Sequence, residues 1–134
     1  MTIQFEPHPE ENWLHALCRD EVRAGDLSRH FPQLEAALAT LEPGFGIVAD
    51  LSGLETMEHA CAAEVQQLMD CFNRAGVERV ARLPAPSGAD IGLGIMSAFH
   101  YGPEVRIRVC QEWSDALAFA RGPASSDRPP TGAG

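Results

Sequence analysis

Several side chains that could do chemistry lie together in the segment DLSGLETMEHAC, which runs from Asp50 to Cys61. It contains carboxylates, the hydroxyls of Ser52 and Thr56, and the imidazole of His59. An imidazole titrates near neutral pH, so His59 could bind a ligand, act as a general base or accept a phosphoryl group. Because no nucleophile is paired with it at a recognisable spacing, we favour a partly exposed histidine in the first turn of a helix.

The spacing of the candidate ligands does not support a metal site. Glu64 follows His59 by five residues, so neither HExxH nor ExxH is formed. The cysteines stand far apart without a CxxC or CxxH pair, and we expect buried thiols in a reducing compartment at Cys18, Cys61, Cys71 and Cys110. We therefore expect no metal and no cofactor.

A second group of candidates lies between the strands predicted at 77–83 and 105–110. Met96 and Phe99 could form the walls of a pocket to which Ser87 and His100 contribute polar groups. The same apolar stripe is also typical of a packed core. The glycines of this stretch do not complete the GxGxxG pattern, so a nucleotide site is disfavoured.

The elements that must position these residues follow from hydrophobic periodicity. TIQFEP and NWLHALCRDEV predict an antiparallel hairpin. After it, helices are predicted at 27–41, 58–75, 91–99 and 113–120, and strands at 44–51, 77–83 and 105–110. This alternation predicts an α/β domain with a mixed, largely parallel sheet and about four helices. Sites in such sheets lie at the carboxyl ends of the strands, here 50–53, 83–87 and 110–112.

Composition limits the classes of partner. The chain has 134 residues, 45% of them hydrophobic, which suits one domain over residues 1–121; residues 122–134 are poor in apolar side chains and predict a flexible tail. The net charge of −9 disfavours nucleic acid and anionic lipid surfaces. Neither a membrane-spanning stretch nor a secretion signal is visible, so we expect a cytoplasmic protein.

The order of elements, together with DLSGL, resembles the STAS superfamily, and within it the SpoIIAA-like group of small bacterial proteins. Asp50 to Leu54 match the Asp-Leu-Ser-Gly-Val type sequence that ends a strand in STAS domains, and Met57 takes the apolar place before the helix. EVRIRVCQEWSDALAF is similar to the final strand and helix of SpoIIAA-like members. The resemblance covers residues 1–121 and implies a STAS-like fold.

The resemblance implies a regulatory or protein-interaction module without catalysis. In anti-sigma-factor antagonists a serine at the start of the helix accepts a phosphoryl group, but this sequence has Glu58, His59 and Ala60 there. Ser52 and Thr56 remain as substitute acceptors. The expected binding residues for a protein partner or ligand are Asp50, Ser52, Gly53, Thr56, Glu58, His59, Ser87, Met96, Phe99 and His100.

Three alternatives stay open. Because the SpoIIAA-like group also resembles Sec14-type domains, the protein could carry a small ligand or lipid in an apolar cavity lined by Met96 and Phe99. It could be a small enzyme that uses His59 or His100, provided that a second catalytic group lies within hydrogen-bond reach. An apolar sheet edge could also support a homodimer.

Overall fold

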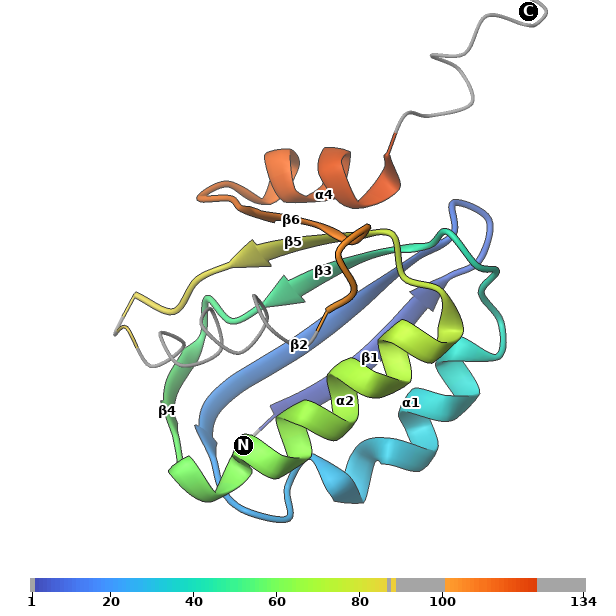
Figure 1. The fold of residues 1–134 in the computed structure, drawn as a ribbon. Coiled ribbons are helices and arrows are strands. Elements are labelled where there is room, and N and C mark those ends of the chain that lie inside the picture. The colour runs from blue at the N-terminus through green and yellow to red at the C-terminus, as the bar shows by residue number, and fades with distance from the viewer. Residues whose placement is uncertain (1, 87, 89–100, 123–134) are drawn as a thin grey trace, which may run out of the picture.

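The computed structural model describes residues 2–86, 88 and 101–122. Its centre is a six-stranded sheet in the order β1-β2-β3-β5-β6, with β4 paired to β2 (Figure 1). Only β1 and β2 pair antiparallel, which confirms the predicted hairpin and the largely parallel sheet. The strands are β1 Thr2–His8, β2 Trp13–Val22, β3 Gly46–Asp50, β4 Leu54–Met57, β5 Arg79–Leu83 and β6 Arg106–Val109.

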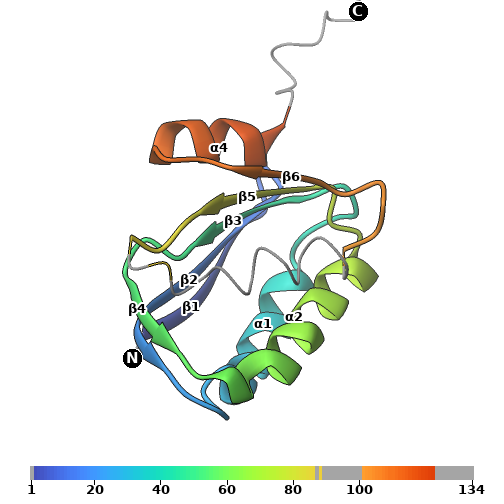
Figure 2. The ribbon, with the colours of Figure 1, turned by 60° about the vertical axis from the view of Figure 1, so that its left-hand side comes forward.

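Helices cover both faces of the sheet. α1 (Phe31–Leu38) and α2 (Ala62–Ala75) lie on one face, and α4 (Trp113–Arg121) lies on the other (Figures 1 and 2). Short 3₁₀ turns, Ser28–His30 and His59–Cys61, lead into α1 and α2. The described residues thus hold three α-helices, and the helix predicted at 91–99 lies outside them.

The helix ends agree with local chemistry. Pro32 lies in the first turn of α1, where its missing N–H leaves no hydrogen bond unmade. Gly76 ends α2 with φ +95°, a left-handed conformation in which its N–H reaches the carbonyls of Phe72 and Asn73. The tail predicted from residue 122 lies outside the described residues, apart from Gly122 at the end of α4.

The core has two layers because side chains alternate along the strands. Leu14, Ala16 and Cys18 of β2 face α1 and α2, whereas Trp13 of β2 packs with Val48, Ala81 and the alanines of α4. Gly46 allows the second layer to close. A Cβ at this position would lie 1.8 Å from the carbonyl oxygen of Ala120, so α4 approaches β3 closely only over a glycine.

The sequence did not predict β4. We expected Leu54 to Met57 to connect β3 with the next helix, but these residues pair in parallel with Asp20 to Val22 at the far end of β2. The first half of β2 pairs with β3 through Trp13 to Leu17, so β3 and β4 follow the same long strand in succession. The predicted loop is therefore shortened to the turn at Leu51 to Gly53.

Candidate functional site

The turn after β3 places Asp50 at the centre of a polar group. The Ser52 Oγ donates to Asp50 Oδ1 at 2.7 Å, and His15 Nε2 lies 3.0 Å from Asp50 Oδ2. The hydrogen bond with His15, assisted by those from Ser52, holds the pKa of Asp50 below its ordinary value although partial burial acts in the opposite direction. Asp50 is thus a buried carboxylate with fixed partners on both oxygens.

This arrangement bears on Ser52 as a phosphoacceptor. A phosphoryl group on its Oγ would lie next to the carboxylate that the hydroxyl now contacts, and the two anions would repel each other. Among the described residues, Thr56 has no hydrogen-bonded carboxylate partner, and it is exposed on β4. Of the two hydroxyls, that of Ser52 is the one hydrogen-bonded to a carboxylate among the described residues.

Glu58 has a structural partner. Its Oε1 accepts a hydrogen bond at 2.9 Å from the backbone N–H of Ala24, in the loop that follows β2. Glu64, six residues further along, makes similar contacts: its carboxylate accepts from the N–H of Gly25 at 2.9 Å and from the Ser28 Oγ at 2.5 Å. The two glutamates tie the loop before α1 to the start of α2.

His59 begins the 3₁₀ turn before α2 and is exposed, as expected. Within the described part of the chain, no recorded hydrogen bond or ion pair joins it to another side chain. Gly53 is half-buried and lies against the Arg19 side chain. Its carbonyl oxygen accepts a hydrogen bond from the Asp20 N–H. The strand-end turn and His59 are therefore adjacent in sequence but do not form one hydrogen-bonded site.

The second predicted group cannot be placed. Ser87, Met96, Phe99 and His100 all lie outside the described residues. The neighbouring Tyr101 is described, and its side chain lines a cavity.

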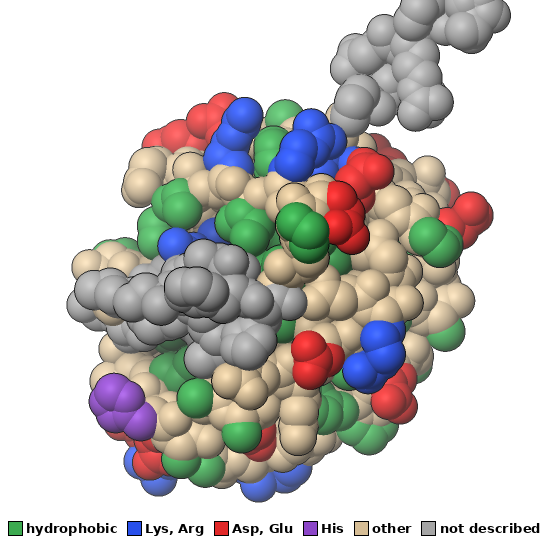
Figure 3. All heavy atoms as spheres, viewed as in Figure 1, with side chains coloured by type: hydrophobic (Ala, Val, Ile, Leu, Met, Phe, Trp, Pro, Cys, Tyr) green, Lys and Arg blue, Asp and Glu red, His purple; other side chains and the backbone are tan. Residues whose placement is uncertain are grey.

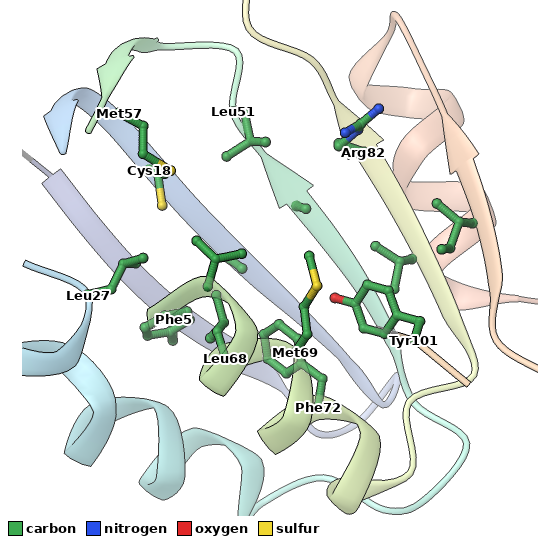
Figure 4. Close-up of a pocket in the computed structure, with 15 residues that line it drawn as sticks. Phe5, Cys18, Leu27, Leu51, Met57, Leu68, Met69, Phe72, Arg82 and Tyr101 are labelled. Atoms are coloured by element: carbon green, nitrogen blue, oxygen red, sulfur yellow. The ribbon is translucent and has the colours of Figure 1, made fainter. Parts of the chain in front are cut away.

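An apolar cavity of about 70 Å³ lies between α2 and the sheet. Figure 4 shows the side chains of Phe5, Cys18 and Met69 directed into it from β1, β2 and α2. Met57 and Leu68 lie at its margin and are half-buried. Fully enclosed apolar cavities in proteins hold apolar guests rather than ordered water.

Two polar side chains lie beside the cavity, Arg82 of β5 and Tyr101. The Tyr101 hydroxyl points toward Met69 (Figure 4), and burial raises the pKa of Tyr101 well above its usual value. No hydrogen bond of this hydroxyl to a described residue is recorded. Burial likewise raises the pKa of the Cys18 thiol to about 12, so Cys18 lines the cavity as an uncharged thiol.

The described residues do not bring three His, Cys, Asp or Glu side chains together in a group able to hold a metal ion. The cysteines are free thiols, of which Cys71 is half-buried and the other three are buried. Among the described helices, none combines the length and the apolarity that crossing a membrane requires.

Comparison with known proteins gives a clear structural likeness. No family model and no curated protein matches the sequence. Among solved structures, the chain is similar to an uncharacterised protein of the DUF3478 family with a SpoIIAA-like fold, from Shewanella loihica PV-4. The TM-score is 0.66 at 19% sequence identity, over 89% of this chain and 92% of that chain. This chain has a SpoIIAA-like fold.

The SpoIIAA-like fold confirms the architecture expected from the sequence resemblance.

The structure also contains an aromatic cluster that sequence reasoning missed, on the sheet face that carries α4. His8 stacks on Trp13 with ring centroids 4.0 Å apart, and Trp113 of α4 packs edge-on against Trp13 and beside His15. The only sequence signal was the alternation in β2 that places Trp13 and His15 on one face.

Proposed function

We propose that the protein binds a small apolar molecule in the cavity between α2 and the sheet. The observation that carries the proposal is the lining of this cavity, whose described side chains are almost all hydrophobic. Binding sites for small molecules are typically apolar hollows with a few polar groups that fix orientation. The Tyr101 hydroxyl supplies a donor of this kind.

The size of the cavity limits the ligand. Its volume of about 70 Å³ is roughly half that of an engineered cavity of about 150 Å³ that binds benzene or xenon. A whole lipid does not fit without movement of the walls. Met57 is well suited to such movement, because methionine is flexible and repacks easily. We therefore propose a compact ligand, or the apolar end of a larger one.

Xenon is a probe of suitable size. Its binding to the purified full chain can be followed by ¹²⁹Xe NMR, with native mass spectrometry of the same preparation to detect a ligand that copurifies. Ala49→Leu adds three carbons to the cavity wall and is expected to abolish xenon binding. Ala63→Leu, on the exposed side of α2, is the matched control and should bind normally. Equal xenon binding by both variants, with no copurified ligand, would contradict the proposal.

A second candidate function, recognition of a protein partner without catalysis, has support from another surface. The segment from Glu55 to Ala60 is exposed except for the half-buried Met57. It combines a short edge strand with the exposed imidazole of His59 at the start of the 3₁₀ turn. Open, charged segments of this kind suit a protein surface better than an enclosed ligand. The free thiols support placing this activity in a reducing compartment such as the cytoplasm.

A photoreactive amino acid tests the second candidate. Introduced at Thr56 in the full chain, it should crosslink a defined partner in cells, whereas the same group at the exposed Gln66 of α2 should not. Identical crosslinks from both positions, or none from Thr56, would remove this candidate.

A further inference from the structure

Arginine side chains gather beside the edge strand β6. All ten basic residues of this acidic chain are arginines. Three of them, Arg79, Arg106 and Arg108, line an open groove of about 540 Å³ between β6 and α4, together with one carboxylate, Asp115. Figure 3 shows basic side chains over this part of the molecule, with acidic side chains beside them. We call this hollow the arginine groove.

The three arginines have different roles. Arg79 is buried and donates to the carbonyls of Phe119 and Ala120 at the end of α4. Burial lowers the pKa of Arg79, and the nearby positive charge of Arg106 acts in the same direction. The Arg108 guanidinium carbon lies 4.6 Å from the centre of the Phe119 ring, within reach of a cation–π interaction. The side chains of Arg106 and Arg108 are exposed to solvent.

The backbone of β6 is also available at this edge. The N–H of Arg106 donates to the carbonyl of Glu78, just before β5, and the N–H of Cys110 donates to that of Arg82 within β5. Because these groups alternate in direction along a strand, the N–H and C=O of Ile107 and Val109 point away from β5. In the described part of the chain, no strand pairs with that edge.

The two faces of β6 differ in chemistry. Arg106 and Arg108 face the side of α4, whereas Ile107 and Val109 face the side of α2 and are 38% and 49% exposed. Side chains directly opposite each other on paired strands interact, and opposite charges stabilise the pair. An added strand therefore matches β6 best when acidic and apolar residues alternate along it.

We propose that β6 binds an extended acidic segment of a partner protein as an additional strand, with alternate carboxylates on Arg106 and Arg108 and the intervening apolar side chains on Ile107 and Val109. Main-chain hydrogen bonds give such strand addition its affinity, and alternate side chains give its specificity. Arginine suits this role because its planar fork binds a carboxylate through two parallel hydrogen bonds.

A second copy of this chain is a poorer occupant of the same edge. In a continuous sheet formed by two β6 strands about a two-fold axis perpendicular to the sheet, residues of like face oppose each other. Arginine would then lie opposite arginine on the α4 side, and like charges in this position destabilise the pair. Charge complementarity thus selects an acidic partner.

The proposal can be tested with labelled synthetic peptides and the full chain, by fluorescence anisotropy at low and high salt. A peptide of alternating glutamate and valine should bind, and binding should weaken as salt increases. Peptides of alternating lysine and valine, or of glutamates followed by valines in separate blocks, should bind at least about tenfold more weakly. Methylation of alternate backbone nitrogens of the first peptide should abolish binding, because it removes the main-chain donors.

Matched variants locate the site on the protein. The double variant Arg106→Gln and Arg108→Gln should lose at least about tenfold in affinity. The control, Arg23→Gln and Arg74→Gln, makes the same change in net charge at exposed positions elsewhere and should change affinity by less than about twofold. Val109→Pro removes an outward N–H and should abolish binding while β5 pairing is kept.

The results separate strand addition from simple charge attraction. Equal binding of the block and alternating peptides, or equal losses in both double variants, would overturn the proposal, as would binding that survives backbone methylation. Absence of binding by the alternating peptide at millimolar protein would overturn it too. The methylated peptides decide the question even where Val109→Pro fails to fold. Ile107 also lines the apolar cavity, but the double arginine variant changes only side chains in the arginine groove on the α4 side, so its outcome is separate from that of the xenon experiment.

Discussion

Replacement of Glu64 by alanine should destabilise the fold more than any other substitution of an acidic surface residue on α1 or α2. Its carboxylate accepts from the N–H of Gly25, the N–H of Ser28 and the Ser28 hydroxyl, at distances from 2.5 to 3.3 Å. All three donors lie in the loop between β2 and α1, so one side chain holds a loop that is more than thirty residues away in sequence.

The magnitude follows from the number and exposure of these bonds. A hydrogen bond to a charged group contributes about 1.5–3 kcal/mol when it is shielded from water. Here the groups are partly exposed and water can replace part of the loss, so we expect about 2 kcal/mol for the set rather than for each bond. At about 4 °C per kcal/mol for a domain of this size, the melting temperature should fall by about 8 °C.

The assay is thermal unfolding of the full chain followed by circular dichroism. Glu35→Ala is the matched control, because Glu35 is an exposed helical glutamate on α1, and it should shift the melting temperature by less than about 2 °C. Glu64→Gln keeps an acceptor oxygen, so its melting temperature should lie between those of Glu64→Ala and Glu35→Ala. Equal melting temperatures for Glu64→Ala and Glu35→Ala would refute the role assigned to the carboxylate.

Three further predictions concern other parts of the fold. Gly46→Ala should cost more than about 3 kcal/mol in the free energy of unfolding, measured in urea, because its Cβ would collide with the carbonyl of Ala120; a cost below about 1 kcal/mol would show that α4 can move away easily. The pKa of Asp50 is lowered in the folded state, so its contribution to stability is present above its unfolded pKa of about 4 and is lost as pH falls through the lower folded value. Asp50→Asn should therefore flatten the acid limb of the stability curve between about pH 5 and 2, and an unchanged limb would contradict this. Burial raises the pKa of Cys18 to about 12, so iodoacetamide at about pH 8 should label Cys71 first and Cys18 only after unfolding, as peptide mapping will show.

The sequence predicted the elements with strong local periodicity. The apolar stripe through Val65, Met69 and Phe72 repeats every three or four residues, and Gly76 provides a clear end, so α2 was predictable. The four residues of β4 are too few to show a period, and their partner strand is distant in sequence. Short elements stabilised only by non-local pairing leave little trace in the local pattern.

The candidate site was predicted less well for the same reason. Asp50 was singled out from its place at a strand end, but its contact with His15 joins residues that are 35 positions apart. That contact depends on the register in which Leu17 opposes Asp50, which no local feature encodes. Glu64 was weighed as a metal ligand and rejected, and its actual partners in the β2–α1 loop could not be seen from spacing.

The distribution of aromatic residues makes the two faces of the sheet optically distinct. The chain has two tryptophans, Trp13 and Trp113, and their rings lie 6.2 Å apart where α4 meets the sheet. Its single tyrosine, Tyr101, lines the cavity on the opposite face. Tryptophan emission should therefore follow the seating of α4, while tyrosine absorbance follows the cavity. One unlabelled sample can thus report separately on each layer of the protein.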